Sequence, residues 1–382
     1  MLPQIPHAIV RYKTNDKYYD SIQEAAISCK NVTLNKSYVP RNWKTHRAIF
    51  DHPLCNQEDI INKVNNFSQP TMFEEIEAVF PPLHTDVLEL LKVVPTQDKT
   101  DIKALTRKVH DRIVDYILKY WDSSKIHCMP HSSGHDSRII SNMIRKLNLP
   151  GEIHFICVEP EVNVARNIVD YIGWPKDSFI GLTGGPVDYF ADVMDFSYLG
   201  ANWSEVSRMV IGEFKVLKAI NEIAPADQIH TISGSRLDEV FGSDWNAGSL
   251  LFNSFTGSMS AKSKWDEVII PVVSVSVLRE VFKYKKMGAK KVKPILQKMV
   301  NPGLEQFKNV TSRYREYDRI SKSFIRYITK SVQNSWYAKT FKKIPIPIKG
   351  TRIIQAHTDL MKDYVKAAIC EHIVKHGCII KI

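Results

Sequence analysis

Hydrophobic and polar positions in the middle of the chain follow two patterns, short apolar runs and helical repeats. The apolar runs predict buried strands at 125–129, 152–158 and 229–232. Apolar residues spaced three and four positions apart predict helices at 102–120 and 163–172, and another through Ile139, Ile140, Met143, Ile144 and Leu147. Strands that alternate with helices in this way predict an α/β fold with a doubly wound, mainly parallel sheet.

A turn of small residues joins the first of these strands to the helix that follows it. Its sequence is Ser132-Ser133-Gly134-His135-Asp136-Ser137. Free backbone N–H groups and the helix dipole make such a turn a site for anions, and three serines add hydroxyl donors. The Asp136 carboxylate would repel phosphate unless a divalent cation lay between them, so the stretch predicts ATP with Mg²⁺. The alternative is a Ser/Gly turn that caps an ordinary helix.

The spacing of this turn excludes the commoner nucleotide loops. No lysine follows Gly134 as in a Walker loop, and the three glycines of a dinucleotide fingerprint are absent. The turn resembles the pyrophosphate-binding loop, Ser-Gly-Gly-x-Asp-Ser, of the PP-loop ATP pyrophosphatase superfamily, whose members cleave ATP between the α- and β-phosphates and pass AMP to a substrate. Ser133 stands where glycine is usual, which is costly if the position needs a positive φ.

A second motif follows the strand at 229–232. Ser233-Gly234-Ser235-Arg236-Leu237-Asp238-Glu239-Val240-Phe241-Gly242 resembles the Ser-Gly-x-Gly-x-Asp-Glu-x-Phe-Gly segment of asparagine synthetases. The resemblance implies that Ser233 and Gly234 contact the nucleotide and that Asp136 and Asp238 share one Mg²⁺. It makes Glu239 a candidate for orienting the nucleophile or accepting a proton. The alternative is an acidic first turn that complements the helix dipole.

The resemblance also implies two further contacts with ATP. Adenine is expected at the carboxyl end of the strand at 152–158, held by backbone groups near Val158. Relatives use a lysine near the α-phosphate, for which Lys308 is the candidate here. The implied reaction activates a carboxylate as its adenylate, which ammonia or another amine then converts into an amide. Small-molecule carboxylate and amine substrates are therefore expected.

The chain divides into three predicted regions. Residues 1–95 form an N-terminal region, 96–310 the ATP-binding domain of asparagine-synthetase-like PP-loop type, and 311–382 a helical, basic extension. Asparagine synthetases carry an N-terminal glutaminase domain with a cysteine after the initiator methionine, whereas this chain has Leu2 and a shorter region. We therefore expect a separate protein to supply ammonia, or the amine to be another compound.

The formal net charge of +11 has three possible interpretations. Lysines could bind nucleic acid, close over the triphosphate, or lie on solvated helix faces. They concentrate in two stretches: Lys283, Lys285, Lys286, Lys290, Lys291, Lys293 and Lys298, and Lys339, Lys342 and Lys343. Two alternative functions remain open, adenylation of a nucleobase in tRNA or DNA and a non-catalytic descendant that serves as a binding protein.

Cysteine usage and hydropathy bear on the compartment. The six cysteines include no Cys-x-x-Cys pair, and no apolar run is long enough to cross a bilayer. The N-terminus lacks the pattern of a secretory signal. These features predict a cytoplasmic protein without a membrane partner.

Overall fold

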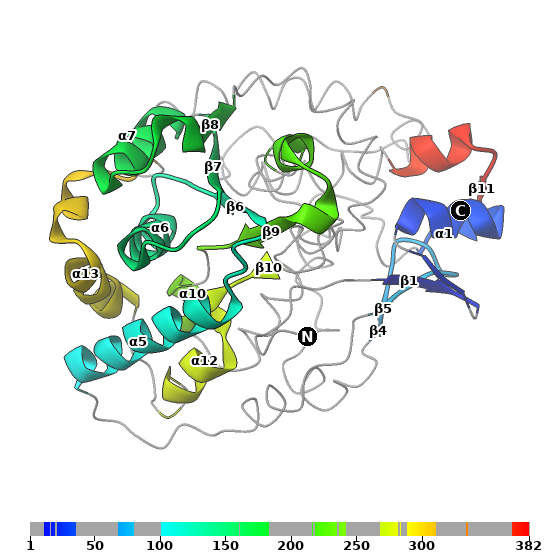
Figure 1. The fold of residues 1–382 in the computed structure, drawn as a ribbon. Coiled ribbons are helices and arrows are strands. Elements are labelled where there is room, and N and C mark those ends of the chain that lie inside the picture. Colours follow the sequence, from blue (N-terminus) through cyan, green and yellow to red (C-terminus); the bar gives the residue numbers. More distant parts are fainter. Residues whose placement is uncertain are drawn as a thin grey trace, which may run out of the picture.

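The computed structural model describes a central α/β unit and a smaller unit built from both ends of the chain (Figure 1). The described residues are 11–15, 17–19, 21–35, 68–79, 101–159, 161–182, 216, 218–234, 237–241, 268–281, 283, 289–310, 334 and 369–381. No helix among them is both long and apolar enough to cross a membrane.

Five parallel strands form the sheet of the central unit in the order β10-β9-β6-β7-β8. The strand of this sheet that comes first in the chain, β6, therefore lies in the middle, with β7 and β8 on one side and β9 and β10 on the other. This is the arrangement of a doubly wound sheet, as the alternating pattern predicts. The strands are β6 (Ile126–Pro130), β7 (Ile153–Val158), β8 (Phe179–Leu182), β9 (Ile229–Ile232) and β10 (Val268–Ile269).

The helices of this unit are amphipathic and bury one face. Their bounds are α5 (Ile102–Tyr120), α6 (His135–Leu147), α7 (Val162–Ile172), α10 (Leu237–Phe241), α12 (Val275–Val281) and α13 (Ala289–Val300). Asp101 caps α5 by accepting from the N–H groups of Lys103 and Ala104 at 3.0 and 3.1 Å. Helix α7 ends at Gly173, whose φ of 88° suits glycine. The predicted helices at 102–120 and 163–172 are thus confirmed.

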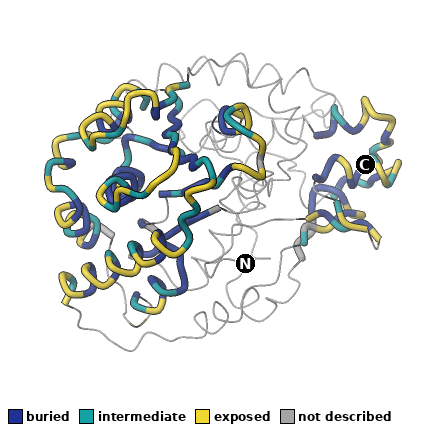
Figure 2. The backbone as a smooth tube through the Cα atoms, in the orientation of Figure 1, coloured by how far each residue is buried: buried dark blue, intermediate teal, exposed yellow. Residues whose placement is uncertain are grey.

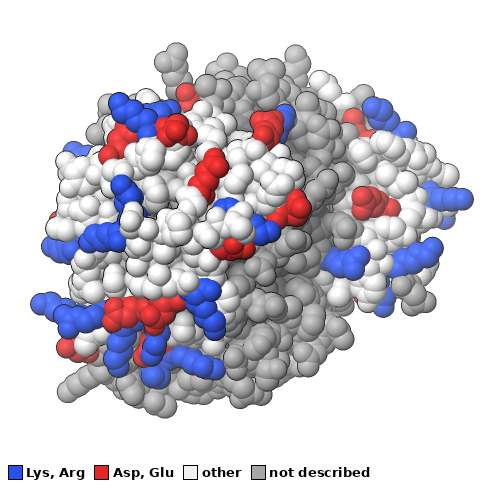
Figure 3. All heavy atoms as spheres, in the orientation of Figure 1, with Lys and Arg blue, Asp and Glu red and all other residues white. Residues whose placement is uncertain are grey.

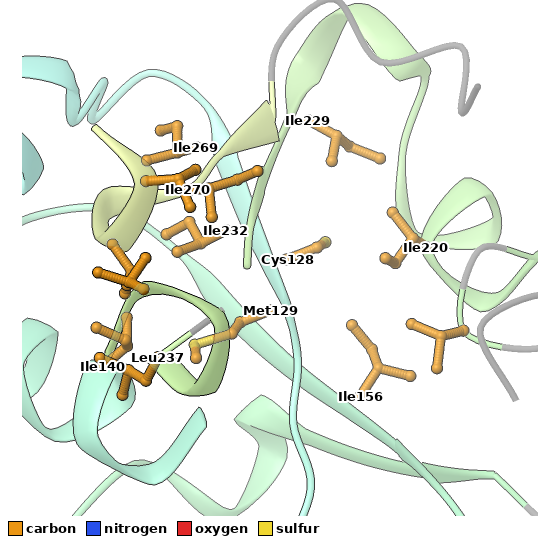
Figure 4. Packing of buried hydrophobic residues seen from close by; sticks show 14 of the residues in the cluster. Cys128, Met129, Ile140, Ile156, Ile220, Ile229, Ile232, Leu237, Ile269 and Ile270 are labelled. Atoms are coloured by element: carbon orange, nitrogen blue, oxygen red, sulfur yellow. The ribbon is translucent and has the colours of Figure 1, made fainter. Parts of the chain in front are cut away.

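Apolar side chains cover both faces of the sheet. Figure 4 shows Met129 directed towards Ile140 and Leu237, and Ile156 directed towards Ile220 in the helical segment at 218–223. All five of these residues are buried. The tube in Figure 2 is accordingly dark along the strands and along the inner side of the helices. This packing fixes the carboxyl ends of β6 and β9 relative to each other.

The smaller unit joins segments from the two ends of the chain. An antiparallel sheet has the order β2-β1-β5-β4, and the C-terminal β11 pairs in parallel with β3. Its elements are β1 (Arg11–Thr14), β2 (Lys17–Tyr19), α1 (Ile22–Cys29), β3 (Asn31–Thr33), β4 (Ser68–Pro70), β5 (Glu77–Val79) and β11 (Ile379–Lys381). The pairing of β11 with β3 links the predicted N-terminal region with the predicted C-terminal extension.

Candidate functional site

The two sequence motifs meet at the carboxyl ends of the neighbouring strands β6 and β9. Residues 132–137, called the loop below, comprise the turn after β6 and the first residues of α6, and Ser233-Gly234 follows β9. The sheet order changes direction between these two strands, since β7 continues on one side of β6 and β9 lies on the other. In doubly wound sheets this switch point is where ligands bind.

Gly234 allows the two loops to approach closely. A Cβ atom at this position would lie 2.8 Å from Ser137 Cα and 2.9 Å from Met129 Cε. Any larger residue would therefore push the turn after β9 away from the start of α6. In addition, the backbone N–H of Leu237 donates to Asp136 Oδ2 at 3.0 Å. The motifs are in direct contact although they lie about a hundred residues apart.

Serine hydroxyls hold the turn before α6 in its shape. The N–H of Gly134 donates to Ser132 Oγ at 3.0 Å, and the N–H of Ser132 donates to Ser137 Oγ at 3.2 Å. The two hydroxyl oxygens are themselves 3.2 Å apart. Gly134 at the N-cap has no side chain to bond the N–H groups of the first turn of α6. These N–H groups are the backbone donors that an anion would use.

Ser133 ties the loop to two other segments. It is fully buried, and its N–H donates to Glu161 Oε2 at 2.8 Å. Its Oγ lies 3.1 Å from both Glu161 Oε2 and Asn309 Oδ1 and accepts from the N–H of Val310 at 3.0 Å. Ser133 is not among the described residues with positive φ, so the strain considered for serine at this position does not arise.

Arg138 holds the loop against the segment that follows α13. Its guanidinium is completely buried and donates to four backbone carbonyls, those of Ser133, Gly134, Leu304 and Phe307. Burial lowers the pKa of Arg138 to about 10, and the negative charge of Glu161 opposes this shift. Arg138 therefore remains a cation at neutral pH and fixes the position of residues 302–310 relative to the loop.

The Asp136 carboxylate is bonded through both oxygens. Oδ2 accepts from Leu237, and Oδ1 lies 2.5 Å from the Lys293 ammonium of α13. Both side chains are largely shielded from solvent, with exposed fractions of 21% and 13%. One residue before Asp136, His135 Nδ1 lies 2.6 Å from Gln297 Oε1, also on α13. Helix α13 thus contacts two successive residues at the start of α6.

The residues at Asp136 do not fit a magnesium ion in this arrangement. A carboxylate oxygen is the donor that Mg²⁺ prefers, but the Lys293 ammonium already lies against Oδ1. The predicted second ligand, Asp238, lies on α10, and the side chains of Asp238 and Glu239 are outside the described residues, as are residues 235–236 and Gly242. Within the described part of the chain, no cluster of three His, Cys, Asp or Glu residues could hold a metal.

The other predicted contacts of ATP are placed as follows. Val158 is half-buried at the end of β7, and its carbonyl accepts from the N–H of Glu161 at 3.3 Å. Lys308 is exposed, but its neighbours Phe307 and Asn309 are bonded to Arg138 and Ser133. Its backbone is therefore held beside the loop. Adenine at Val158 and phosphate at Lys308 remain predictions.

Most of the residues that support the loop are not among the site residues predicted from the sequence. Arg138 and Gln297 are polar residues at buried positions of amphipathic helices, which is a signal that the pattern contains. Glu161 and Asn309 gave no such signal, because they reach the loop only through the fold. Lys293 belongs to the lysine-rich stretch for which contact with the triphosphate is one of the three interpretations.

Of the known proteins, only solved structures resemble this chain. No known protein-family model matches this sequence, and no curated protein matches it. Among solved structures, the chain is similar to the U34-tRNA thiolase NcsA from Methanococcus maripaludis with its [4Fe-4S] cluster, at 14% identity over 65% of this chain and 84% of that one, with a TM-score of 0.28. It is also similar to NAD+ synthetase from Burkholderia pseudomallei, at 14% identity over 61% and 95% of the two chains, with a TM-score of 0.24. Similarity at this level does not assign an activity.

Proposed function

We propose that this protein is an ATP-dependent ligase of the PP-loop superfamily that forms AMP and pyrophosphate. Its substrate carboxylate attacks the α-phosphorus of ATP, pyrophosphate leaves, and ammonia or an amine then displaces AMP to form an amide. The observation that carries the proposal is the contact between the two motifs at the switch point, through Asp136 with Leu237 and Ser137 with Gly234. An isolated Ser/Gly turn would not require this second loop.

In this proposal, different residues of the chain bind the pyrophosphate and act on the nucleophile. The first turn of α6 and the hydroxyls of Ser132 and Ser137 bind the leaving pyrophosphate, because their donors converge at the carboxyl end of β6. Ser233 and Gly234, which follow β9, line the opposite side of this pyrophosphate site. The asparagine-synthetase-like assignment rests on the Asp238-Glu239 motif, in which Glu239 orients the nucleophile or accepts its proton. Mg²⁺ would accompany ATP and neutralise charge on its phosphates.

A second candidate is adenylation of a nucleobase in tRNA or DNA, favoured by the net charge of +11. The described surface gives it limited support. Basic side chains over α5 lie beside acidic ones (Figure 3), and Arg112 pairs with Asp115 at 3.5 Å and with Glu280 at 3.7 Å. Ion pairs of this kind offset the positive potential that a phosphate backbone would require.

The test is turnover of ATP labelled at the α-phosphate, with AMP resolved from ADP. Reactions contain Mg²⁺ and either pooled amino acids with ammonia or pooled tRNA and DNA. We expect AMP only with the first pool, and its loss in Asp136→Ala but not in Asp170→Ala, a change at an exposed position of α7. AMP only with nucleic acid would support the second candidate. Absence of ATP binding, with no AMP in any pool, would contradict both and leave a binding protein.

A further inference from the structure

Helix α13 presents two polar side chains to the start of α6. Lys293 and Gln297 are four residues apart and so lie on one helix face. They contact Asp136 and His135 at 2.5 and 2.6 Å. Val292, Leu296 and Val300 are buried on the same helix. The packing of α13 therefore places the backbone of Lys293 beside α6, and the contact with Asp136 orients its ammonium.

This contact changes the charge of the loop. A carboxylate beside a phosphate site normally needs a divalent cation, because two anions repel each other. Here the Lys293 ammonium is already present at Oδ1, with only 13% of its side chain exposed, and the ion pair has no net charge. An ammonium has three N–H donors, so it can bond a carboxylate oxygen and a phosphate oxygen together.

We propose that the Lys293 ammonium takes the place of a divalent cation at Asp136. Asp136 is then a positioning residue that directs Lys293 towards the β- and γ-phosphates of ATP, and any Mg²⁺ brought with ATP is bound without Asp136. This inference rests on the proposed function, since it concerns the same loop. It predicts that the loop binds pyrophosphate in the absence of divalent cations.

The chain provides matched variants for a direct test. Lys291 lies two residues from Lys293 on α13 and is exposed, so Lys291→Gln removes the same charge from the same helix without touching Asp136. Asp136→Asn removes the carboxylate charge but keeps the shape of the side chain. A metal ligand would lose Mg²⁺ through this second change, whereas a residue that positions Lys293 keeps an oxygen that accepts from the ammonium.

The experiment is calorimetric titration of inorganic pyrophosphate into the full-length protein, once in EDTA and once in Mg²⁺. In EDTA we expect the wild type to bind, Lys293→Gln to bind at least about tenfold more weakly, and Lys291→Gln to stay within about threefold, because a charge-assisted hydrogen bond is lost only in the former. Asp136→Asn is expected to stay within about threefold of the wild type, since the asparagine Oδ1 can still accept from the Lys293 ammonium and keep it in place. Lys293→Arg keeps a cation and should still bind pyrophosphate in EDTA. If Lys293→Gln unfolds at a lower temperature than the wild type, Lys293→Arg serves as the folded variant for comparison.

Three results would overturn this proposal. If pyrophosphate bound only with Mg²⁺ and Asp136→Asn abolished binding, Asp136 would be a metal ligand, and the proposed ligase function would stand. Equal weakening in Lys291→Gln and Lys293→Gln would show a general effect of charge. If neither pyrophosphate nor α,β-methylene-ATP, the analogue that cannot be cleaved between the α- and β-phosphates, bound to the wild type in either buffer, the ligase function and the role of Lys293 would both be wrong.

Discussion

Replacing Arg138 by methionine should separate the loop from the segment after α13. Methionine fills a similar length of apolar space but donates no hydrogen bond, so the carbonyls of Ser133, Gly134, Leu304 and Phe307 lose their donor. Hydrogen bonds from charged groups contribute about 1.5–3 kcal/mol each, and they are not additive around one guanidinium. Loss of the desolvation cost of the buried cation offsets part of the total. We therefore expect the free energy of unfolding to fall by about 3–5 kcal/mol.

The assay is urea unfolding followed by circular dichroism, together with hydrogen exchange of the loop. Arg145→Met is the matched control, because Arg145 lies two turns further along α6, is only half-buried and donates to one carbonyl, that of Gly173. We expect it to cost less than about 1 kcal/mol. In Arg138→Met, amides at 132–137 and 302–310 should exchange faster than in the control.

Two results would refute the reasoning about Arg138. One is a free energy of unfolding within about 1 kcal/mol of the wild type, which is the range of an ordinary surface change. The other is unchanged exchange at 302–310. Either would mean that the four carbonyls find other donors and that Arg138 does not hold these segments together.

Three further changes test the packing around the sheet and the loop. The pKa of His127 is lowered to about 4 by burial and by the neighbouring His230, so the unfolded chain takes up a proton below about pH 6.5 that folded His127 does not. The free energy of unfolding should therefore fall by up to about 3 kcal/mol between pH 6.5 and pH 4, and urea titrations at both pH values should show that His127→Phe removes this part of the loss. Gly234→Ala should lower the free energy of unfolding by about 1–3 kcal/mol, because its Cβ would lie 2.8 Å from Ser137 Cα. An unchanged stability would contradict the close approach of the loops. Ser133→Gly should lower the free energy of unfolding by about 1–2 kcal/mol, because the Val310 N–H loses its acceptor and no strain from a positive φ is relieved. A more stable variant would show that glycine suits this position better than serine.

The pattern of apolar positions was sufficient to predict the elements around the loop. The strands β6, β7 and β9 fall within a residue of the strands predicted at 125–129, 152–158 and 229–232. These elements follow from local periodicity, which a sequence records directly. The strand β8 was missed, because Phe179–Leu182 is short and includes Gly181.

The sequence by itself determined the fold class, the two motifs and their order along the chain. The tertiary structure decided which groups meet: Leu237 with Asp136, Gly234 with Ser137, and Lys293 with Asp136. Motifs record residue types at fixed spacing, whereas these contacts join segments about a hundred or more residues apart. Their geometry depends on the order of strands in the sheet and on the packing of α13 against α6. For this reason the charge partner of Asp136 could be identified only from the folded chain.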